Sequence, residues 1–335
     1  MEVLTKIHNN NLVKWAKDKP EVVVLSADLT SSTEANGFQA AYPDRFFSMG
    51  VAEQNMLSFA AGMAKEGYIP LVHTFAVFIY RQALNQIIGS IAYPNLPVKM
   101  FGFLPGITTP GGATHQAIED VAIMRSIPNM SVFEVGDATE IETIMNEVYN
   151  TDGPVYVRML RGEVPRLFDA NIPFKANRAR VLSEGDDITL ISAGITTEEA
   201  IRATAVLKKK GVSIQHLHVS THKPFTDPQI LEAVSKAKHG VITMENHTIM
   251  GGLGTEVAEV MAENGIGKKL HRLGLNDTFA HGGSRQYLMK IYNLNSISLI
   301  NNIEELLGQK LDISENDLES VRIEAVHSAA KVEAL

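Results

Sequence analysis

The sequence of 335 residues contains no cysteine, which excludes disulfide bonds and thiolate nucleophiles and is typical of a cytosolic enzyme. It also has no excess of positive charge. Its formal net charge is −8, so its composition does not favour binding to nucleic acid or to an anionic membrane. The first residues lack the apolar stretch of a signal peptide. The longest apolar run, residues 69–80, is too short to span a bilayer. We therefore expect a cytoplasmic protein.

The composition is that of a soluble globular protein, with 45% hydrophobic and 20% charged residues. Short apolar runs alternate with helical patterns along the chain. We predict strands at 21–25, 45–51, 69–74, 97–103, 130–135 and 154–159, and again at 188–192, 212–218, 240–244 and 269–274. We predict helices at 5–18, 53–66, 76–92, 115–126, 138–149, 196–210, 227–238, 254–264 and 284–293. This alternation predicts an α/β fold with parallel sheets that are covered on both faces.

The length of the chain suggests two domains. We place the first α/β domain at 1–168 and the second at 186–310. Between them, residues 169–185 have few periodic apolar positions and read as a linker. We interpret residues 311–335 as a helical tail that covers a subunit contact. Its apolar positions at helical spacing are Leu318, Val321, Ile323 and Val326.

The stretch Met49-Gly50-Val51-Ala52-Glu53-Gln54-Asn55-Met56 joins a predicted strand to a predicted helix. The strand breaks at Gly50, and Glu53 falls in the first turn of the helix, where the helix dipole favours a carboxylate. A Glu that can hold or yield a proton is a candidate general acid or base. The alternative is that Glu53 only stabilises its helix.

A second segment, Thr74-Phe75-Ala76-Val77-Phe78, adds two aromatic rings downstream. In this order and spacing, the two segments resemble the pyrimidine-domain motifs of the transketolase family. The resemblance implies two α/β domains, pyrimidine-binding and C-terminal, and thiamine diphosphate as the cofactor. It also implies that Glu53 bonds the aminopyrimidine ring and promotes loss of the thiazolium proton, while Phe75 and Phe78 pack against the pyrimidine.

The segment Ser26-Ala27-Asp28-Leu29 follows the first predicted strand. An acidic residue just past the carboxyl end of a parallel strand lies where α/β sheets bind ligands. The family has a similar segment that approaches the cofactor and the subunit interface, so Asp28 is a candidate cofactor-binding residue. A simple helix N-cap is the alternative for this side chain.

Residues 105–116 form a loop rich in Gly and Pro that ends in Thr114-His115-Gln116. The loop resembles the family's Asp-Gly-Pro-Thr-His-Gln segment, whose His contacts substrate oxygens. The resemblance therefore makes His115 a candidate catalytic and substrate residue, and a structural His is the alternative. Gly111 stands where the family motif has an Asp that binds a substrate hydroxyl, which predicts a donor other than the usual ketose.

Arg161 precedes Pro165 by four residues, as does an Arg that binds the substrate phosphate in the family. An interdomain salt bridge is the alternative for Arg158 and Arg161. Arg81 is a further substrate candidate. The family's other phosphate-binding Arg and His correspond here to Thr5 and Phe103, neither of which is a cation. The Gly-rich turn at 245–254 resembles one in the family's C-terminal domain and reads as structural.

The chain has no Gly-Asp-Gly motif, which in transketolases marks the domain that binds the cofactor diphosphate through Mg²⁺. We therefore predict no metal ligands in this chain and a partner that holds the Mg²⁺. The resemblance implies the second subunit of a split transketolase. It would transfer a two-carbon ketol unit between sugar phosphates, in an α2β2 heterotetramer with an N-terminal subunit.

Three alternatives stay open. A 2-oxo acid dehydrogenase β subunit shares both domains, but it usually has His-Ser-Gln-Ser where residues 114–117 are Thr-His-Gln-Ala. A deoxyxylulose-phosphate synthase normally carries both halves on one chain. A non-catalytic assembly subunit would have no reason to keep Glu53, Phe75, Phe78 and His115 together.

Overall fold

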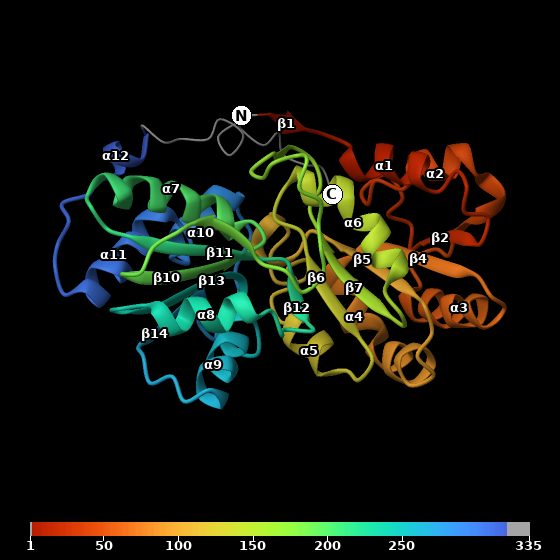
Figure 1. Cartoon of the computed structure of the whole chain (residues 1–335). Helices are drawn as coiled ribbons and strands as arrows, with labels where there is room; N and C mark the ends of the chain where they lie inside the picture. Colours follow the sequence, from red (N-terminus) through yellow and green to blue (C-terminus); the bar gives the residue numbers. More distant parts are fainter. Residues whose placement is uncertain (1, 320–335) are drawn as a thin grey trace.

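The computed structural model describes residues 2–319 and shows two α/β units side by side (Figure 1). The first unit has a seven-stranded sheet in the order β12-β6-β7-β5-β4-β2-β3. Six strands are parallel: β2 (Val22–Ser26), β3 (Phe46–Ser48), β4 (Ile69–Phe75), β5 (Lys99–Phe103), β6 (Ser131–Glu134) and β7 (Val155–Met159). Most of their residues are buried on both faces, as the continuous apolar runs predict.

The helices of the first unit are α1 (Ile7–Trp15), α2 (Asn36–Ala41), α3 (Glu53–Lys65), α4 (Ala76–Gln86), α5 (Asp120–Ser126) and α6 (Ala138–Asn150). Three shorter helical segments are η1 (Pro43–Arg45), η2 (Ile87–Ala92) and η3 (Gly106–Thr108). The single helix predicted over 76–92 is α4 followed by the π-helix η2, with non-helical backbone at Ala83. A short ladder pairs β1 (Val3–Leu4) with β8 (Val164–Pro165).

The second unit has a five-stranded sheet in the order β14-β13-β10-β11-β9. Its strands are β9 (Arg180–Ser183), β10 (Ile188–Ala193), β11 (Ile214–Val219), β13 (Gly240–Thr248) and β14 (Leu270–Leu275). Helices α8 (Pro228–Lys236) and α9 (Leu253–Glu263) lie on one side of it (Figure 1). The other side carries α7 (Thr196–Lys209), α10 (Arg285–Ile291), α11 (Ser296–Leu307) and α12 (Glu315–Glu319).

Both sheets are mixed, because each has one antiparallel edge strand that the sequence analysis did not predict. Strand β9 lies within the predicted linker and pairs with β11. Strand β12 (Thr221–Lys223) crosses from the second half of the chain to pair with β6 (Figure 1). Helices α2 and α11 are likewise not predicted from the sequence.

The helix predicted over 115–126 is wrong at its start, since α5 begins only at Asp120. Of the predicted tail, residues 315–319 form α12 and Leu318 is buried. The positions of Val321, Ile323 and Val326 lie outside the described residues. Within residues 2–319, we find no helix of the length and apolarity that crossing a membrane requires.

A buried polar network joins the two units. The Arg158 guanidinium, fully buried in β7, pairs with Asp120 at 2.9 Å and with Glu134 at 2.7 Å. His222, on β12, lies between two carboxylates, with Nε2 3.0 Å from Glu134 and Nδ1 3.0 Å from Glu256. Both ion pairs of Arg158 lie within the first unit, so they are not the interdomain salt bridge that the alternative for this residue proposed. The guanidinium reaches the second unit only through a hydrogen bond to the Asn246 carbonyl, among the contacts of the described residues.

The charge on His222 makes the junction sensitive to pH. Burial alone would lower the pKa of His222, but the Glu256 and Glu134 carboxylates outweigh it and raise this pKa to about 10. Because the folded pKa exceeds the unfolded value of about 6.5, the stability contributed by the imidazolium is complete below pH ~6.5. It is lost as the pH rises through about 10.

We therefore expect His222→Gln to lower the free energy of unfolding by about 3–5 kcal/mol at pH 6, the usual cost of breaking a buried ion pair. Above pH about 10, the wild-type imidazole is neutral, so the difference in the free energy of unfolding between the variant and the wild type should shrink. Denaturant titrations at both pH values measure it, with His239→Gln, at an exposed position, as the matched control. A difference that does not change with pH would contradict the charged state of His222.

Candidate active site

Four candidate segments meet at one edge of the first sheet. Glu53 follows β3, Asp28 follows β2, Phe75 ends β4, and the loop that carries His115 follows β5. These strands are parallel neighbours in the order β5-β4-β2-β3, so their carboxyl ends lie at the same edge. Ligands of α/β proteins bind at this edge. The topology therefore brings together residues that are far apart in the sequence.

Glu53 is the first residue of α3, as the sequence predicts. Gly50 makes the turn from β3 with a φ of 68°, a conformation that favours glycine. The N-cap residue, Ala52, has no side-chain oxygen to cap the helix. Glu53 is therefore the acidic group at this helix end, where the dipole stabilises its charge, and it is 8% exposed. A largely buried carboxylate that keeps some access suits proton exchange with a bound ring.

Three rings form a cluster beside this edge. Phe75 and Phe78 stack with their centroids 5.8 Å apart and their planes 25° apart. The His115 ring meets them edge-on, at 5.5 Å from Phe78 and 6.4 Å from Phe75. Phe75 is buried, whereas Phe78 and His115 are partly exposed. The structure thus brings the two predicted aromatic residues and the predicted His into contact.

His115 lies in a loop rather than in a helix, and its position depends on Gly111. The Thr114 hydroxyl lies 2.9 Å from His115 Nδ1. A Cβ placed on Gly111 would lie 2.9 Å from the Cβ of His115, closer than side chains normally approach. An Asp at position 111 would therefore displace His115. This contact gives a physical reason for the Gly where the family motif has Asp.

Arg81 supports the same loop. Its guanidinium bonds both oxygens of Glu119, at 2.7 and 3.0 Å, and donates to the carbonyls of Ala113 and Gln116. The Gln116 amide in turn donates to the His281 carbonyl of the second unit at 3.4 Å. These contacts hold the loop on both sides of His115. A direct contact of Arg81 with substrate stays a prediction.

Asp28 is exposed and adopts a left-handed backbone conformation with a φ of 60° directly after β2. It does not cap α2, whose N-cap is Ala35, so the N-cap alternative is not what the structure shows.

Arg161 follows β7 and is partly buried. Burial raises the pKa of Glu34, and backbone donors together with the Arg161 charge oppose this rise. Arg161 therefore lies near a carboxylate at the start of α1.

One residue that contacts the loop was interpreted only as part of a structural turn. Asn246, on β13, bonds the backbone of residues 105–107. The two segments are separated by 139 residues in sequence, so no local pattern indicates their contact.

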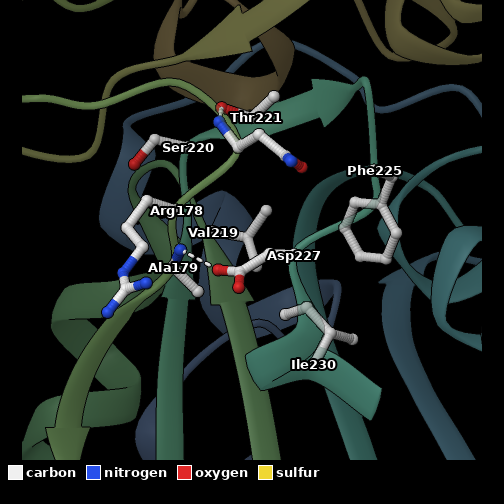
Figure 2. Close-up of a pocket in the computed structure, with 9 residues that line it drawn as sticks. Arg178, Ala179, Val219, Ser220, Thr221, Phe225, Asp227 and Ile230 are labelled. Carbon is white, nitrogen blue, oxygen red and sulfur yellow. Dashed lines mark hydrogen bonds between the residues drawn. The ribbon is translucent and has the colours of Figure 1, made fainter.

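The pocket in Figure 2 lies in the second unit, where β9, β11 and β12 meet α8. Its volume is about 10 Å³, close to the room that one water molecule needs. The Asp227 carboxylate faces it and accepts a hydrogen bond from the Ala179 amide at 2.6 Å (Figure 2). We interpret it as a gap in packing rather than a ligand site.

The protein thus has two α/β units, and one sheet edge of the first unit carries a carboxylate at a helix start, a stacked aromatic pair and an imidazole. Residues 3–166 match the model of the transketolase pyrimidine-binding domain, and residues 177–298 match that of the transketolase C-terminal domain. The chain belongs to the transketolase family.

Three relatives and one solved structure are similar to this chain over most of its length. A putative transketolase C-terminal section of Methanocaldococcus jannaschii is 39% identical, over 90% of this chain and 95% of that protein. A 6-deoxy-6-sulfo-D-fructose transketolase subunit of a Clostridium species is 37% identical, over 89% of this chain and 92% of that protein. A 1-deoxy-D-xylulose-5-phosphate synthase of Natranaerobius thermophilus is 30% identical over 92% of this chain but only 49% of that protein. A split-gene transketolase, solved as an inactive β4 tetramer, superposes with a TM-score of 0.81 and 37% identity, over 91% of this chain and 98% of that one.

Membership in this family implies thiamine diphosphate as the cofactor. The residues at the sheet edge fit its pyrimidine end. Glu53 offers a carboxylate to a ring nitrogen, and Phe78 offers a partly exposed ring face. Phe75 stacks on Phe78 and so supports its ring. The chemistry of this group of side chains matches a basic aromatic ring.

We expect Phe78→Ala to weaken cofactor binding more than sugar binding. An aromatic contact is worth about 0.5–1.5 kcal/mol beyond area burial, which corresponds to a roughly 2- to 13-fold rise in the apparent cofactor constant. Phe75→Ala should also cost about 3–5 kcal/mol of stability, since this ring is buried. The matched control is Phe133→Ala, which removes a buried ring on β6 and should lower stability without changing cofactor affinity. Kinetics and melting curves measure both effects, and unchanged cofactor affinity in Phe78→Ala would assign that ring to the core.

Proposed function

We propose that this chain is the second subunit of a two-component transketolase, which transfers a two-carbon ketol unit from a ketose donor to an aldose acceptor. The observation that supports the proposal is that Glu53 follows β3 at the same sheet edge that carries the ring cluster of Phe75, Phe78 and His115. The family relationship supports it, because this chain spans nearly the whole length of relatives named as a C-terminal section or as a subunit.

Each residue of the site has a distinct task in this proposal. When bound, thiamine diphosphate supplies a nucleophilic thiazolium carbon that can stabilise the transferred unit. Glu53 would hold or move a proton at N1′ of the bound aminopyrimidine. Phe75 and Phe78 orient the pyrimidine plane, and Asp28 lies at the rim of the same edge. His115 donates a hydrogen bond to the donor's carbonyl oxygen, where negative charge develops.

The proposal includes a partner subunit that binds the diphosphate and Mg²⁺. Mg²⁺ requires near-octahedral oxygen ligands, largely from phosphates and a few protein groups, and the Gly-Asp-Gly motif that would mark such a site does not occur in this chain. The inactive β4 form of a similar split-gene transketolase supports a requirement for a second kind of subunit. We propose an α2β2 heterotetramer in the cytoplasm.

For the substrate, we propose a donor with an anionic end whose hydroxyl pattern differs from that of common ketose phosphates. Gly111 replaces an Asp, and its place is tied to the position of His115. Thr5 and Phe103 stand at the family's other two anion-binding positions, and neither side chain is a cation. Thr5 is exposed and Phe103 is fully buried. Arg161 remains as a forked donor for phosphate or sulfonate oxygens. A relative that acts on a sulfo-sugar supports such a range of anions.

A second candidate is a deoxyxylulose-phosphate-synthase-like activity, which the similarity to half of such an enzyme supports. The test mixes this chain with a subunit that carries the Gly-Asp-Gly motif and supplies thiamine diphosphate and Mg²⁺. We expect ketol transfer from a ketose to an aldose only in the mixture. Condensation of pyruvate with glyceraldehyde 3-phosphate in its place would favour the second candidate, and full turnover by this chain alone would refute the split enzyme.

A further inference from the structure

The second unit reaches the loop of the candidate site through one amide side chain. Asn246 lies on β13 and is 1% exposed. Its Oδ1 accepts a hydrogen bond from the Ile107 amide at 2.9 Å, and its Nδ2 donates to the Pro105 carbonyl at 3.0 Å. One side chain thus pairs with the backbone on both sides of Gly106 and uses both ends of its amide.

The segment that Asn246 binds is the neck of the His115 loop. Gly106 donates its amide to the Ala117 carbonyl at 2.7 Å, which closes the loop between these two residues. Arg158 donates to the same Ala117 carbonyl at 3.1 Å and to the Asn246 carbonyl at 2.9 Å. His115 is two residues from Ala117. The position of its ring therefore depends on a neck that the second unit holds.

The contact at the neck is close and specific. Gly106 has a φ of 57°, and a Cβ placed there would lie only 2.2 Å from Asn246 Oδ1. Only Gly allows both this backbone conformation and this approach. Because Asn246 is buried beneath the loop, it has no access to a substrate. Its contribution has to act through the loop.

We propose that Asn246 is a positioning residue that sets the place of His115, so that the second unit contributes to the active site of the first. The role of His115 at the substrate rests on the function proposed above. The interaction between Asn246 and the neck does not, and it can be tested separately.

The variant that tests the proposal is Asn246→Asp in the assembled two-subunit enzyme. Asp has nearly the same shape and keeps an acceptor for the Ile107 amide. It replaces the donor to the Pro105 carbonyl with an oxygen, which repels that carbonyl and opens the neck. Misplacement of a catalytic group by about 1 Å can cost 10²-fold, so we expect kcat to fall roughly 10- to 100-fold. The apparent constant for thiamine diphosphate should change little.

The matched control is Glu245→Gln, on the same strand and similarly buried. The Glu245 carboxylate accepts hydrogen bonds from the Leu253 and Gly254 amides instead of binding the loop. Both variants are then combined with His115→Ala. If Asn246 acts through His115, Asn246→Asp should cost no further activity in the His115→Ala background. Any loss caused by Glu245→Gln should be the same in both backgrounds.

A second readout does not depend on turnover. Amide hydrogen exchange of peptides spanning residues 105–117 should be faster in Asn246→Asp than in the wild type and unchanged in Glu245→Gln. Unchanged exchange in Asn246→Asp, or an equal loss of activity with and without His115, would overturn the positioning role. If the wild-type assembly shows no ketol transfer but the exchange result holds, the proposed function fails while the contact between Asn246 and the neck stands.

Discussion

Glu53→Gln is expected to reduce turnover by about 10²–10⁴-fold in the assembled enzyme, the range typical for loss of a general acid or base. The amide has nearly the same shape as the carboxylate, so the turn at Gly50 and the start of α3 should stay in place. It cannot exchange a proton with the aminopyrimidine. The loss should therefore appear in kcat rather than in the fold.

The measurement is the steady-state rate together with circular dichroism and a melting curve. Glu66→Gln is the matched control, because Glu66 is an exposed carboxylate at the other end of the same helix. It should leave the rate unchanged. In Glu53→Gln, loss of the favourable charge at the start of α3 should lower the free energy of unfolding by only about 0.3–1 kcal/mol. Turnover of Glu53→Gln near that of the wild type would refute the proposed role of this carboxylate.

Arg161→Ala is expected to raise the Michaelis constant for a phosphorylated or sulfonated donor by roughly 10- to 100-fold, since a hydrogen bond to a charged group is worth about 1.5–3 kcal/mol. The constant for a non-phosphorylated donor such as hydroxypyruvate should change little. The Michaelis constant of Arg161→Lys should lie between those of the wild type and of Arg161→Ala, because Lys keeps the charge but lacks the planar fork. Initial rates with both donors measure the effect.

The nearby Arg166 offers a control for this experiment, since it pairs with Glu2 and Glu142. Arg166→Ala should not distinguish the two donors. Because Glu34 lies close to Arg161, a melting curve should accompany the kinetics. Equal losses with both donors would show that Arg161 stabilises the domain and does not bind the anion.

The parts of the fold that sequence predicts well are those that local burial determines. Strand β2 is buried over its whole length and is apolar except at its last residue, Ser26, so its run of Val and Leu indicates the strand directly. Glu53 and Phe75 could be found for a related reason. Phe75 is the last residue of β4, and Glu53 follows the short turn after β3, so both lie at the edge where a parallel sheet binds ligands.

Other features depend on partners far along the chain. Strand β12 has three residues and forms only because it meets β6, nearly ninety positions earlier in the sequence. Residues 109–116 are held as a loop by Arg81, from α4, which binds the carbonyls of Ala113 and Gln116. The neck of this loop is held by Asn246, from the other unit. Local periodicity does not indicate contacts between segments that are far apart in the sequence. The helix start predicted at 115 was therefore wrong, and Asn246 was interpreted as part of a structural turn.

The most direct test of the split site is calorimetric titration of thiamine diphosphate with Mg²⁺ into this chain alone and into its mixture with the Gly-Asp-Gly subunit. The chain alone offers Glu53 and the aromatic pair to the pyrimidine end, while the charged diphosphate needs the partner. The account predicts weak binding to the chain alone that does not depend on Mg²⁺, and tight, Mg²⁺-dependent binding to the mixture. Tight, Mg²⁺-dependent binding to the chain alone would contradict it.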